Sequence, residues 1–239
     1  MPAWSGTIPI YINNFNWFSP VKNLAAFFES IPGTEMTIID NASTYPPLLE
    51  WYDHCRCRVV RLIDNCGPYA PWNMGIITAP EKHRATYCSD YYVVTDPDLS
   101  LDECPADMMD LLVQGWHRYP SISKIGLSLE IDDLPLTSPL AEGVKEWESQ
   151  YWRDRRDDQF FDAAVDTTFA MYHIDVPFGR AKATGNSLRA DRPYTARHLP
   201  WYIDPAHMSE EEEYYVKTTR AGHWGTALQR LIPGRYCDR

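Results

Sequence analysis

The sequence lacks the long apolar runs, the basic excess and the metal-binding cysteine patterns that would assign its class directly. No stretch approaches the about 18 consecutive apolar residues that a membrane-spanning helix needs. The formal net charge is −11 at pH 7, whereas a nucleic-acid-binding surface requires a basic stripe. We therefore expect no membrane span and no nucleic-acid partner. A nucleotide ligand stays possible, because a divalent metal neutralises a diphosphate locally.

The six cysteines form no zinc-binding pattern. Cys55 and Cys57 stand too close together for a zinc knuckle, and no second Cys or His pair completes one. Residues 1–12 lack the basic start and the apolar run of a secretory signal. We therefore expect a cytoplasmic protein with reduced thiols.

The composition that is present is typical of a globular protein. Hydrophobic residues make up 44% of the 239 residues and charged residues 23%, which argues against wholesale disorder. A chain of this length buries a sizeable core. No internal repeat or low-complexity tract interrupts the sequence, so we expect residues 1–239 to form one compact domain.

The first hundred residues alternate strand-like and helix-like segments. Pro20 and Pro47 suit the first turns of two helices that separate β-branched, apolar runs. The predicted strands cover residues 7–12, 35–40, 58–62 and 91–95. Strands joined by helices through short connections predict an α/β fold with a mostly parallel sheet and helices on both faces.

The second half of the sequence shows a different pattern of predicted helices and strands. A helix is predicted over 104–119, with Met108 and Trp116 among its inward residues, and another over 141–158. Val144, Trp147 and Tyr151 share one face of the second helix. Strands are predicted over 123–131 and 164–172, residues 185–205 are rich in polar and turn residues, and an acidic helix begins at 210–213 behind Ser209.

Polar side chains follow three of the predicted strands. Asn13 and Asn14 follow the first, Asp40 the second, and Asp96 and Asp98 the fourth. In an extended segment residues i and i+2 point to the same side, so both carboxylates can face one spot. Two oxygen ligands at a strand end suit Mg²⁺ or Mn²⁺ with a diphosphate, although Asp-Pro-Asp is also good turn chemistry. Ligands of such sheets bind outside the carboxyl ends of the strands.

The order of these signals resembles that of the GT-A glycosyltransferases, nucleotide-sugar-dependent enzymes related to the large family 2. Asp96-Pro97-Asp98 is similar to their hallmark, a strand that ends in Asp-x-Asp. Ile8 to Asn16 resembles their first strand and nucleotide loop. Ile38 to Thr44 resembles their second strand, which ends in an acidic residue and a small Ser/Thr loop. The resemblance covers residues 7–100 well and 120–205 more loosely.

The resemblance implies a Rossmann-like GT-A fold, with a nucleotide-sugar-binding half at 1–100 and an acceptor-binding and catalytic half at 101–239 packed on the same domain. It implies a metal-dependent transferase that moves a sugar from a nucleotide-diphosphate donor, a UDP sugar being favoured, to a glycan or another hydroxyl acceptor. The implied cofactor is Mn²⁺ or Mg²⁺. Inversion at C1 is favoured over retention, and retention would need no dedicated base.

The resemblance also implies roles for particular residues. The implied metal ligands are Asp98, His198 and Asp96. The implied nucleotide-binding residues are Asn13, Asn14, Asp40, Asn65, Trp72 and Asp96. Asp166 is the implied catalytic base, since His198 follows it at the spacing typical of the family. The family's base segment usually carries two adjacent acids, whereas this chain reads Val165-Asp166-Thr167, so Asp132 and Asp133 stay as competing candidates.

Three basic residues, Arg180, Lys182 and Arg189, are candidates to close over the diphosphate of the donor.

Two other classes of protein are alternatives to a glycosyltransferase. A sugar-1-phosphate nucleotidyltransferase would need a Gly-rich, basic loop after the first strand, and residues 13–16 contain neither kind of residue. A non-catalytic carbohydrate-binding protein would use the aromatic residues, 13% of the chain, to hold glycans without metal or nucleotide.

Overall fold

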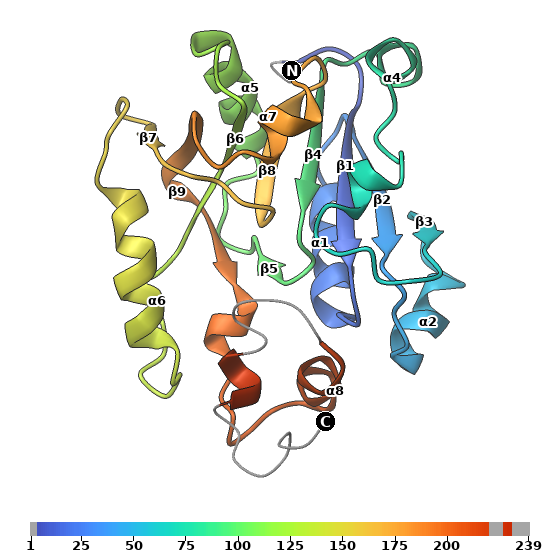
Figure 1. Ribbon diagram of the computed structural model, residues 1–239, viewed down its shortest axis with the longest axis vertical. Helices are drawn as coiled ribbons and strands as arrows, with labels where there is room; N and C mark the ends of the chain where they lie inside the picture. The colour runs from blue at the N-terminus through green and yellow to red at the C-terminus, as the bar shows by residue number, and fades with distance from the viewer. Residues whose placement is uncertain (1–3, 220–226, 231–239) are drawn as a thin grey trace.

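A single curled sheet connects both halves of the chain in the computed structural model, which describes residues 4–219 and 227–230 (Figure 1). Its order is β3-β2-β1-β4-β8-β6-β9-β5, with β7 paired to β9. The strands are β1 (Ile8–Asn14), β2 (Thr34–Asp40), β3 (Arg58–Arg61), β4 (Tyr91–Thr95), β5 (Leu99–Ser100), β6 (Lys124–Leu129), β7 (Phe160–Asp162), β8 (Phe169–His173) and β9 (Ser187–His198). The helices are α1 (Ser19–Glu29), α2 (Pro46–Tyr52), α3 (Ala70–Asn73), α4 (Pro80–Tyr87), α5 (Met108–Arg118), α6 (Ala141–Glu148), α7 (Phe178–Lys182) and α8 (Glu210–Thr218), with 3₁₀ turns η1 (Ser149–Trp152) and η2 (Leu199–Tyr202).

The four strands of the first half lie side by side and parallel, as predicted. The strand predicted over 91–95 coincides with β4, and β1 to β3 differ from their predicted bounds by at most two residues. These segments are locally consistent, because apolar β-branched runs alternate with proline-initiated helices.

The prediction of a mostly parallel sheet is wrong for the second half. β8 runs antiparallel to both of its neighbours, β4 and β6, and β5 and β7 run antiparallel to β9. The described strands thus form four parallel and four antiparallel pairings, and the sheet is mixed. Residue alternation looks the same in both kinds of pairing, so the sequence pattern did not distinguish them.

The longest strand, β9, occupies the segment that we expected to be turn-rich. Its two ends pair with β6 on either side of a register shift between Leu127 and Ser128. The intervening residues are polar and partly exposed, which hides the apolar alternation of a strand. Conversely, the strand predicted over 164–172 begins only at Phe169, and residues 164–168 form a loop.

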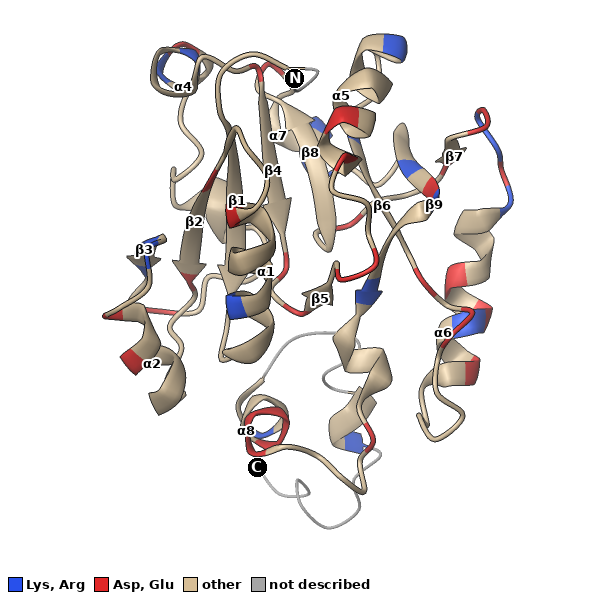
Figure 2. Cartoon of the chain, turned by 180° about the vertical axis from the view of Figure 1, so that it is seen from behind, with Lys and Arg blue, Asp and Glu red and all other residues tan. Residues whose placement is uncertain are grey.

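Apolar clusters cover both faces of the sheet, as expected. Ile10 and Val93 face α1 and α5 in the larger cluster, whereas Tyr92 and Val94 face the α7 side in the smaller one. Figure 1 shows α7 in front of the sheet, and the reverse view in Figure 2 shows α1 in front. The inward residues predicted for α5, including Met108 and Trp116, are buried.

Helix α8 begins at the predicted position, and its first turn also supports the amino-terminal end of α1. Ser209 and Glu212 form a capping box, and the first turn is acidic (Figure 2). The Glu211 carboxylate accepts hydrogen bonds from the backbone amides of Phe18 and Ser19, at 2.5 and 2.9 Å. A carboxylate at the amino-terminal end of a helix stabilises it through both hydrogen bonding and the helix dipole.

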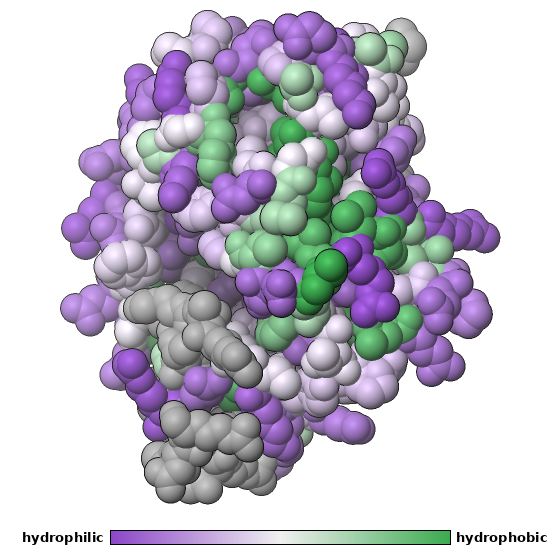
Figure 3. Space-filling model, turned by 45° about the vertical axis from the view of Figure 1, so that its right-hand side comes forward, coloured by the Kyte–Doolittle hydropathy of each residue, from purple (hydrophilic) through white to green (hydrophobic). Residues whose placement is uncertain are grey.

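Some apolar side chains remain on the surface. Figure 3 shows apolar residues exposed on one face of the molecule. The loop between β3 and α4 carries Ile63, which is 96% exposed, and Met74, which is half-exposed. No described helix is long and apolar enough to cross a membrane. Cys237, one of the six cysteines, lies outside the described residues.

The close approach of β6 and β8 gives the first prediction. A Cβ added at Gly126 would stand 2.2 Å from the carbonyl oxygen of Phe169 and 2.8 Å from Cγ1 of Val165. We expect Gly126→Ala to destabilise the protein by about 2–3 kcal/mol in urea unfolding, because the backbone of β8 must shift. In the control Gly143→Ala, the new methyl group on α6 meets open space, and stability should stay equal or rise by up to about 1 kcal/mol. Equal stabilities of the two variants would contradict this packing.

Candidate functional site

The connection of the first four strands creates a crevice at the carboxyl ends of β1 and β4. The chain proceeds from β1 to β2 and β3 on one side, then returns to β4 on the other side of β1. Such a switch in strand order leaves a crevice between the two diverging loops, where open α/β sheets bind ligands. Asn13 near the end of β1 and Asp96 just after β4 both line a cleft at this point.

The antiparallel β8 brings Asp166 to the same edge of the sheet, because β8 begins where β4 ends. The carbonyl oxygen of Thr168 accepts hydrogen bonds from Thr95 Oγ1 at 2.7 Å and from the Asp96 amide at 3.0 Å. Thr167 Oγ1 donates to Asp96 Oδ2 at 3.1 Å. The loop that carries Asp166 is therefore fixed directly to the end of β4.

His198 reaches the cleft because β9 runs parallel to β6 and ends at the same edge. The short strand β5 pairs with the end of β9, and the Leu199 amide donates to the Asp98 carbonyl oxygen at 2.8 Å. This pairing leaves His198 Nε2 3.6 Å from Asp98 Oδ1. The structure thus brings together Asp96, Asp98, Asp166 and His198, which are far apart in the sequence.

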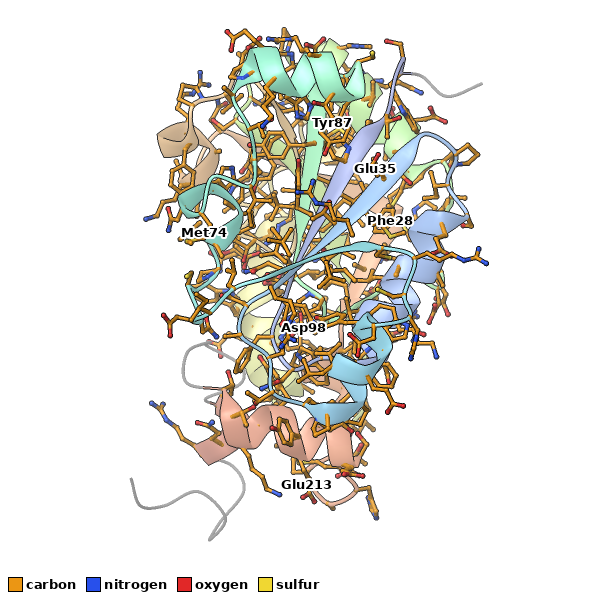
Figure 4. All side chains as sticks on the ribbon, turned by 90° about the vertical axis from the view of Figure 1, so that its right-hand side faces the viewer. Phe28, Glu35, Met74, Tyr87, Asp98 and Glu213 are labelled. Atoms are coloured by element: carbon orange, nitrogen blue, oxygen red, sulfur yellow. The ribbon has the colours of Figure 1, made fainter. Side chains whose placement is uncertain are left out.

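The cleft has a volume of about 570 Å³ and is acidic. Among the described residues that line it, Asp96, Asp98, Glu148 and Asp166 carry carboxylates, and none is a lysine or arginine. Figure 4 shows Asp98 between the ends of the strands and helix α8. An anionic ligand here would need a cation that these lining side chains do not supply.

Desolvation and the charge of neighbouring carboxylates raise the pKa of both carboxyls of the Asp-Pro-Asp segment. Desolvation is the largest effect on Asp96, and the charges of Asp98 and Asp166 raise its pKa further. Desolvation also raises the pKa of Asp98, partly offset by His198. Asp98 Oδ1 has no hydrogen-bond donor among the described residues. A metal ion bound here would stabilise the ionised form of both carboxyls.

Asp166 behaves differently from its two neighbours. Desolvation is the largest single effect on its pKa and raises it. The hydrogen bonds from the hydroxyl and amide of Thr168, together with the charge of Arg189 and of His198 when it is protonated, lower the pKa by more, so it lies below the usual value of an aspartate. The carboxylate is therefore ionised at neutral pH and able to accept a proton from a ligand hydroxyl.

Asp98 and His198 are suited to hold one divalent ion together. Two ligands in adjacent octahedral positions at ~2.1 Å from a metal stand ~3 Å apart, close to the 3.6 Å between Oδ1 and Nε2. A carboxylate oxygen and an imidazole nitrogen form a donor set that suits Mn²⁺. Within residues 4–219 and 227–230, no group of three or more His, Cys, Asp or Glu side chains is placed to hold a metal ion, so the structure does not bring Asp96 in as a third ligand beside Asp98 and His198. The remaining positions would be left for water and a ligand.

A buried ion pair fixes the wall of the cleft that α6 forms. Arg189 Nη1 lies 2.7 Å from Glu148 Oε2, and both side chains are at most 5% exposed. Arg189 Nε also donates to the Ala164 carbonyl oxygen at 2.7 Å. Arg189 thus links α6 to the loop that carries Asp166.

Three residues expected to bind the nucleotide have structural partners instead of facing this cleft. Asn14 Nδ2 donates to Tyr52 Oη at 2.8 Å and to the Trp17 carbonyl oxygen. Asp40 is fully buried and accepts from Arg61 Nε at 3.1 Å and from the Ser43 amide. The Trp72 indole donates to Tyr92 Oη at 3.1 Å.

Asn13 and Asn65 do line the cleft. Asn13 Nδ2 and Asn41 Nδ2 both donate to the carbonyl oxygen of Gly67, at 3.2 and 3.0 Å. Asn65 Oδ1 accepts from the Gly67 amide. These bonds fix the loop after β3 against the ends of β1 and β2.

The competing acids form a separate ion-pair network with β9. Asp132 lies 2.8 Å from Arg192, and Asp133 pairs with Arg197 and accepts from Tyr202 Oη. Of the candidate basic residues, Arg180 donates to the Ser121 carbonyl oxygen. Lys182 lies over the ring of Tyr69, with Nζ 4.6 Å from its centroid.

Several aromatic side chains and one acid in the cleft were not predicted from the sequence. Trp17 and Tyr215 stack with their ring centroids 4.3 Å apart, and both line the cleft. Trp147 lines it too and is 51% exposed, whereas its neighbour Glu148 is buried. Nine tryptophans in 239 residues were a signal for such a surface, but composition does not say which of them lie exposed.

Comparisons with known proteins leave the family open. No family model matches the chain, and no curated protein matches it. Among solved structures, one described only as a mycobacterial protein aligns with 78% of this chain and 65% of its own, at 10% identity and a TM-score of 0.48. Glucosyl-3-phosphoglycerate synthase from Mycobacterium tuberculosis aligns with 58% of this chain and 50% of its own, at 15% identity and a TM-score of 0.37. At TM-scores below 0.5 these likenesses assign neither a family nor an activity, and the chain spans less than two thirds of either neighbour.

Proposed function

We propose that the protein is a metal-dependent glycosyltransferase that transfers a sugar from a nucleotide-diphosphate donor, favoured to be a UDP sugar, to a hydroxyl acceptor. The observation that carries the proposal is the cluster at the strand-order switch, where the buried Asp98 and His198 lie in one cleft with the partly buried Asp96 and the exposed Asp166. Carboxylates gathered in one cleft disfavour one another's charged forms, and a bound divalent cation would relieve this repulsion.

In this proposal Asp98 and His198 hold a divalent ion beside the donor diphosphate. When bound, Mn²⁺ or Mg²⁺ would stabilise the charge that develops on the leaving diphosphate. Asp96 lies between the two sides of the cleft, hydrogen-bonded to Thr167, where it would contact the ribose or a metal-bound water. Asn13 and Asn65 would line the nucleotide side.

Asp166 would act as the base. As the acceptor oxygen forms its bond to C1, the bond from C1 to the diphosphate breaks, and the Asp166 carboxylate takes the hydroxyl proton. Asp166 is ionised at neutral pH, as a proton acceptor must be, and a dedicated base at this position is what inversion requires. A nucleotidyltransferase is less well supported, because the described cleft lining contains no lysine or arginine for the triphosphate.

The direct test is thermal stabilisation by ligand. We expect UDP and Mn²⁺ together to raise the melting temperature, since a ligand at 100 times its Kd stabilises by about 2.7 kcal/mol. Neither UDP with EDTA nor Mn²⁺ alone should give the same shift. A parallel screen of UDP sugars should then show slow, Mn²⁺-dependent UDP release. Absence of any shift or release, beside a clear glycan-binding signal, would instead favour a carbohydrate-binding protein.

A further inference from the structure

The loop before β8 is held by the first residues of β9. Ser187 Oγ donates to the carbonyl oxygen of Ala163 at 2.9 Å and accepts from the Val165 amide at 3.3 Å. Two residues further along β9, Arg189 Nε donates to the carbonyl oxygen of Ala164 at 2.7 Å. Because residues i and i+2 of a strand point to the same side, Ser187 and Arg189 form one row that faces this loop.

The guanidinium group of Arg189 is itself fixed by two further contacts. The side chain is 4% exposed, and Nη1 lies 2.7 Å from Oε2 of the buried Glu148, the last residue of α6. Its Cζ lies 4.2 Å from the ring centroid of Tyr151 in η1, within cation–π distance. A planar guanidinium group presents donors in several fixed directions, so it binds a carboxylate and a backbone carbonyl at the same time. Arg189 therefore joins α6, η1 and the loop before β8.

The carboxylate of Asp166 follows two residues after the carbonyl group that Arg189 binds. Asp166 lines the cleft, whereas Arg189 lies buried behind the loop. Desolvation raises the pKa of Asp166 and the hydrogen bonds from Thr168 lower it, and the positive charge of Arg189 lowers it further. Arg189 thus acts on Asp166 both through the backbone at Ala164 and through its charge.

We infer that Arg189 is the positioning residue of Asp166, because it fixes the loop before β8 so that the carboxylate stays directed at the acceptor hydroxyl. Arg189 itself touches no substrate. This inference rests on the proposed function and deepens it by naming the group that controls the base. Binding of the donor at Asp98 and His198 does not depend on Arg189.

The first test is Arg189→Lys in the full chain. Lysine keeps the positive charge, but its single ammonium group cannot reproduce the fixed donors that bind Glu148 and Ala164 together. We expect kcat to fall about 30-fold while the donor KM and the stabilisation by UDP with Mn²⁺ change less than about twofold, since a small displacement of a catalytic group costs up to about 10²-fold.

The rates are those of UDP release with saturating Mn²⁺ and the UDP sugar that turns over fastest. The acceptor probes are the methyl glycosides of glucose, galactose, mannose and N-acetylglucosamine, or water where none of them accelerates release. The control Arg156→Lys changes an exposed arginine that pairs with Asp162, and it should leave both constants unchanged. An unchanged kcat in Arg189→Lys, or a loss of donor binding as large as the loss of kcat, overturns the inference.

A double-mutant cycle separates positioning from general structural damage. If Arg189 acts through Asp166, Arg189→Lys should lower the rate less than about threefold in the Asp166→Asn background, because the group that it positions is already inactive. A structural lesion would instead lower the rate by the same factor in both backgrounds, and that result overturns the inference.

A second variant covers the case in which Arg189→Lys does not fold. Removal of one partner of a buried ion pair leaves an uncompensated charge, whereas removal of both charges avoids this cost. Arg189→Gln is then combined with Glu148→Gln and compared with Glu148→Gln alone. The same loss of kcat, absent in the Asp166→Asn background, is expected. Melting temperatures without ligand show which variants fold.

The two proposals fail in different ways. If wild-type protein shows neither UDP release from any donor nor stabilisation by UDP with Mn²⁺, the proposed function fails, and this inference fails with it. If wild-type protein releases UDP and Asp166→Asn lowers the rate, but the Arg189 variants give the contrary results, only the role of Arg189 is wrong.

Discussion

Replacing Asp98 with asparagine is expected to abolish the stabilisation by UDP with Mn²⁺ and to lower Mn²⁺-dependent UDP release by about 10³-fold. That loss corresponds to about 4 kcal/mol of transition-state stabilisation, the scale of a removed metal contribution. Asp98 Oδ1 lies 3.6 Å from His198 Nε2, so the variant replaces the carboxylate best placed to share an ion with the histidine by an uncharged amide, a weaker ligand. Thermal shift and a coupled UDP assay measure the two effects.

The same substitution should not unfold the protein. Burial raises the pKa of Asp98 above its unfolded value, so this group favours folding below the unfolded pKa and loses that contribution as pH rises through the folded pKa. At neutral pH without metal, the ionised side chain is therefore a cost, which asparagine removes. We expect Asp98→Asn to melt at or above the wild-type temperature at pH 7 without ligands.

A nearby aspartate supplies the control for Asp98. Asp102 is exposed, four residues further on, and accepts a hydrogen bond from Ser100. Asp102→Asn should retain both the ligand-induced shift and the activity. Activity of Asp98→Asn within threefold of wild type would rule out the assigned metal position.

Replacing Asp166 with asparagine should lower acceptor transfer by about 10³-fold while the stabilisation by UDP with Mn²⁺ persists. General-base catalysis contributes about 10²–10⁴-fold, and asparagine has nearly the same shape but accepts no proton. Since the pKa of Asp166 is lowered, protonation of this base should not reduce wild-type kcat until the pH falls below the ordinary range of aspartate, as long as saturating Mn²⁺ keeps the metal bound beside His198. Initial rates of transfer across this pH range, with saturating donor and acceptor, measure both points.

The control for Asp166 is Asp162, a partly exposed acid on β7 that pairs with Arg156. Asp162→Asn should keep full transfer activity. Loss of the ligand-induced shift in Asp166→Asn would place this carboxylate on the metal or nucleotide instead. Full transfer activity of Asp166→Asn would mean that a group other than Asp166 is the base.

The first half of the fold could be predicted because its signals are local. Each strand is a short apolar run, and each following helix begins with a proline or a capping residue, so Tyr91–Thr95 was predicted to the residue. The neighbouring carboxylates Asp96 and Asp98 follow from the end of that strand. Parallel order β3-β2-β1-β4 then puts the strand ends at one edge without further information.

The second half depended on partners that a local pattern does not contain. Glu148 is buried because Arg189, 41 residues away, neutralises it, and this turns Trp147 toward the cleft instead of the core. Similarly, Asp132 and Asp133 resemble a catalytic pair in the sequence, but in the structure they form ion pairs with Arg192 and Arg197 of β9. Since β9 itself was not predicted, these pairings were invisible.

The absence of lysine and arginine from the described lining of the cleft has a consequence for regulation. If a divalent ion is the main counter-charge for the diphosphate, nucleotide occupancy follows the free concentration of that ion. A nucleoside monophosphate, with a single phosphate to share it, would compete poorly with UDP. Chelation of the ion would then weaken the binding of both donor and product, so the free concentration of manganese or magnesium would control the rate of turnover.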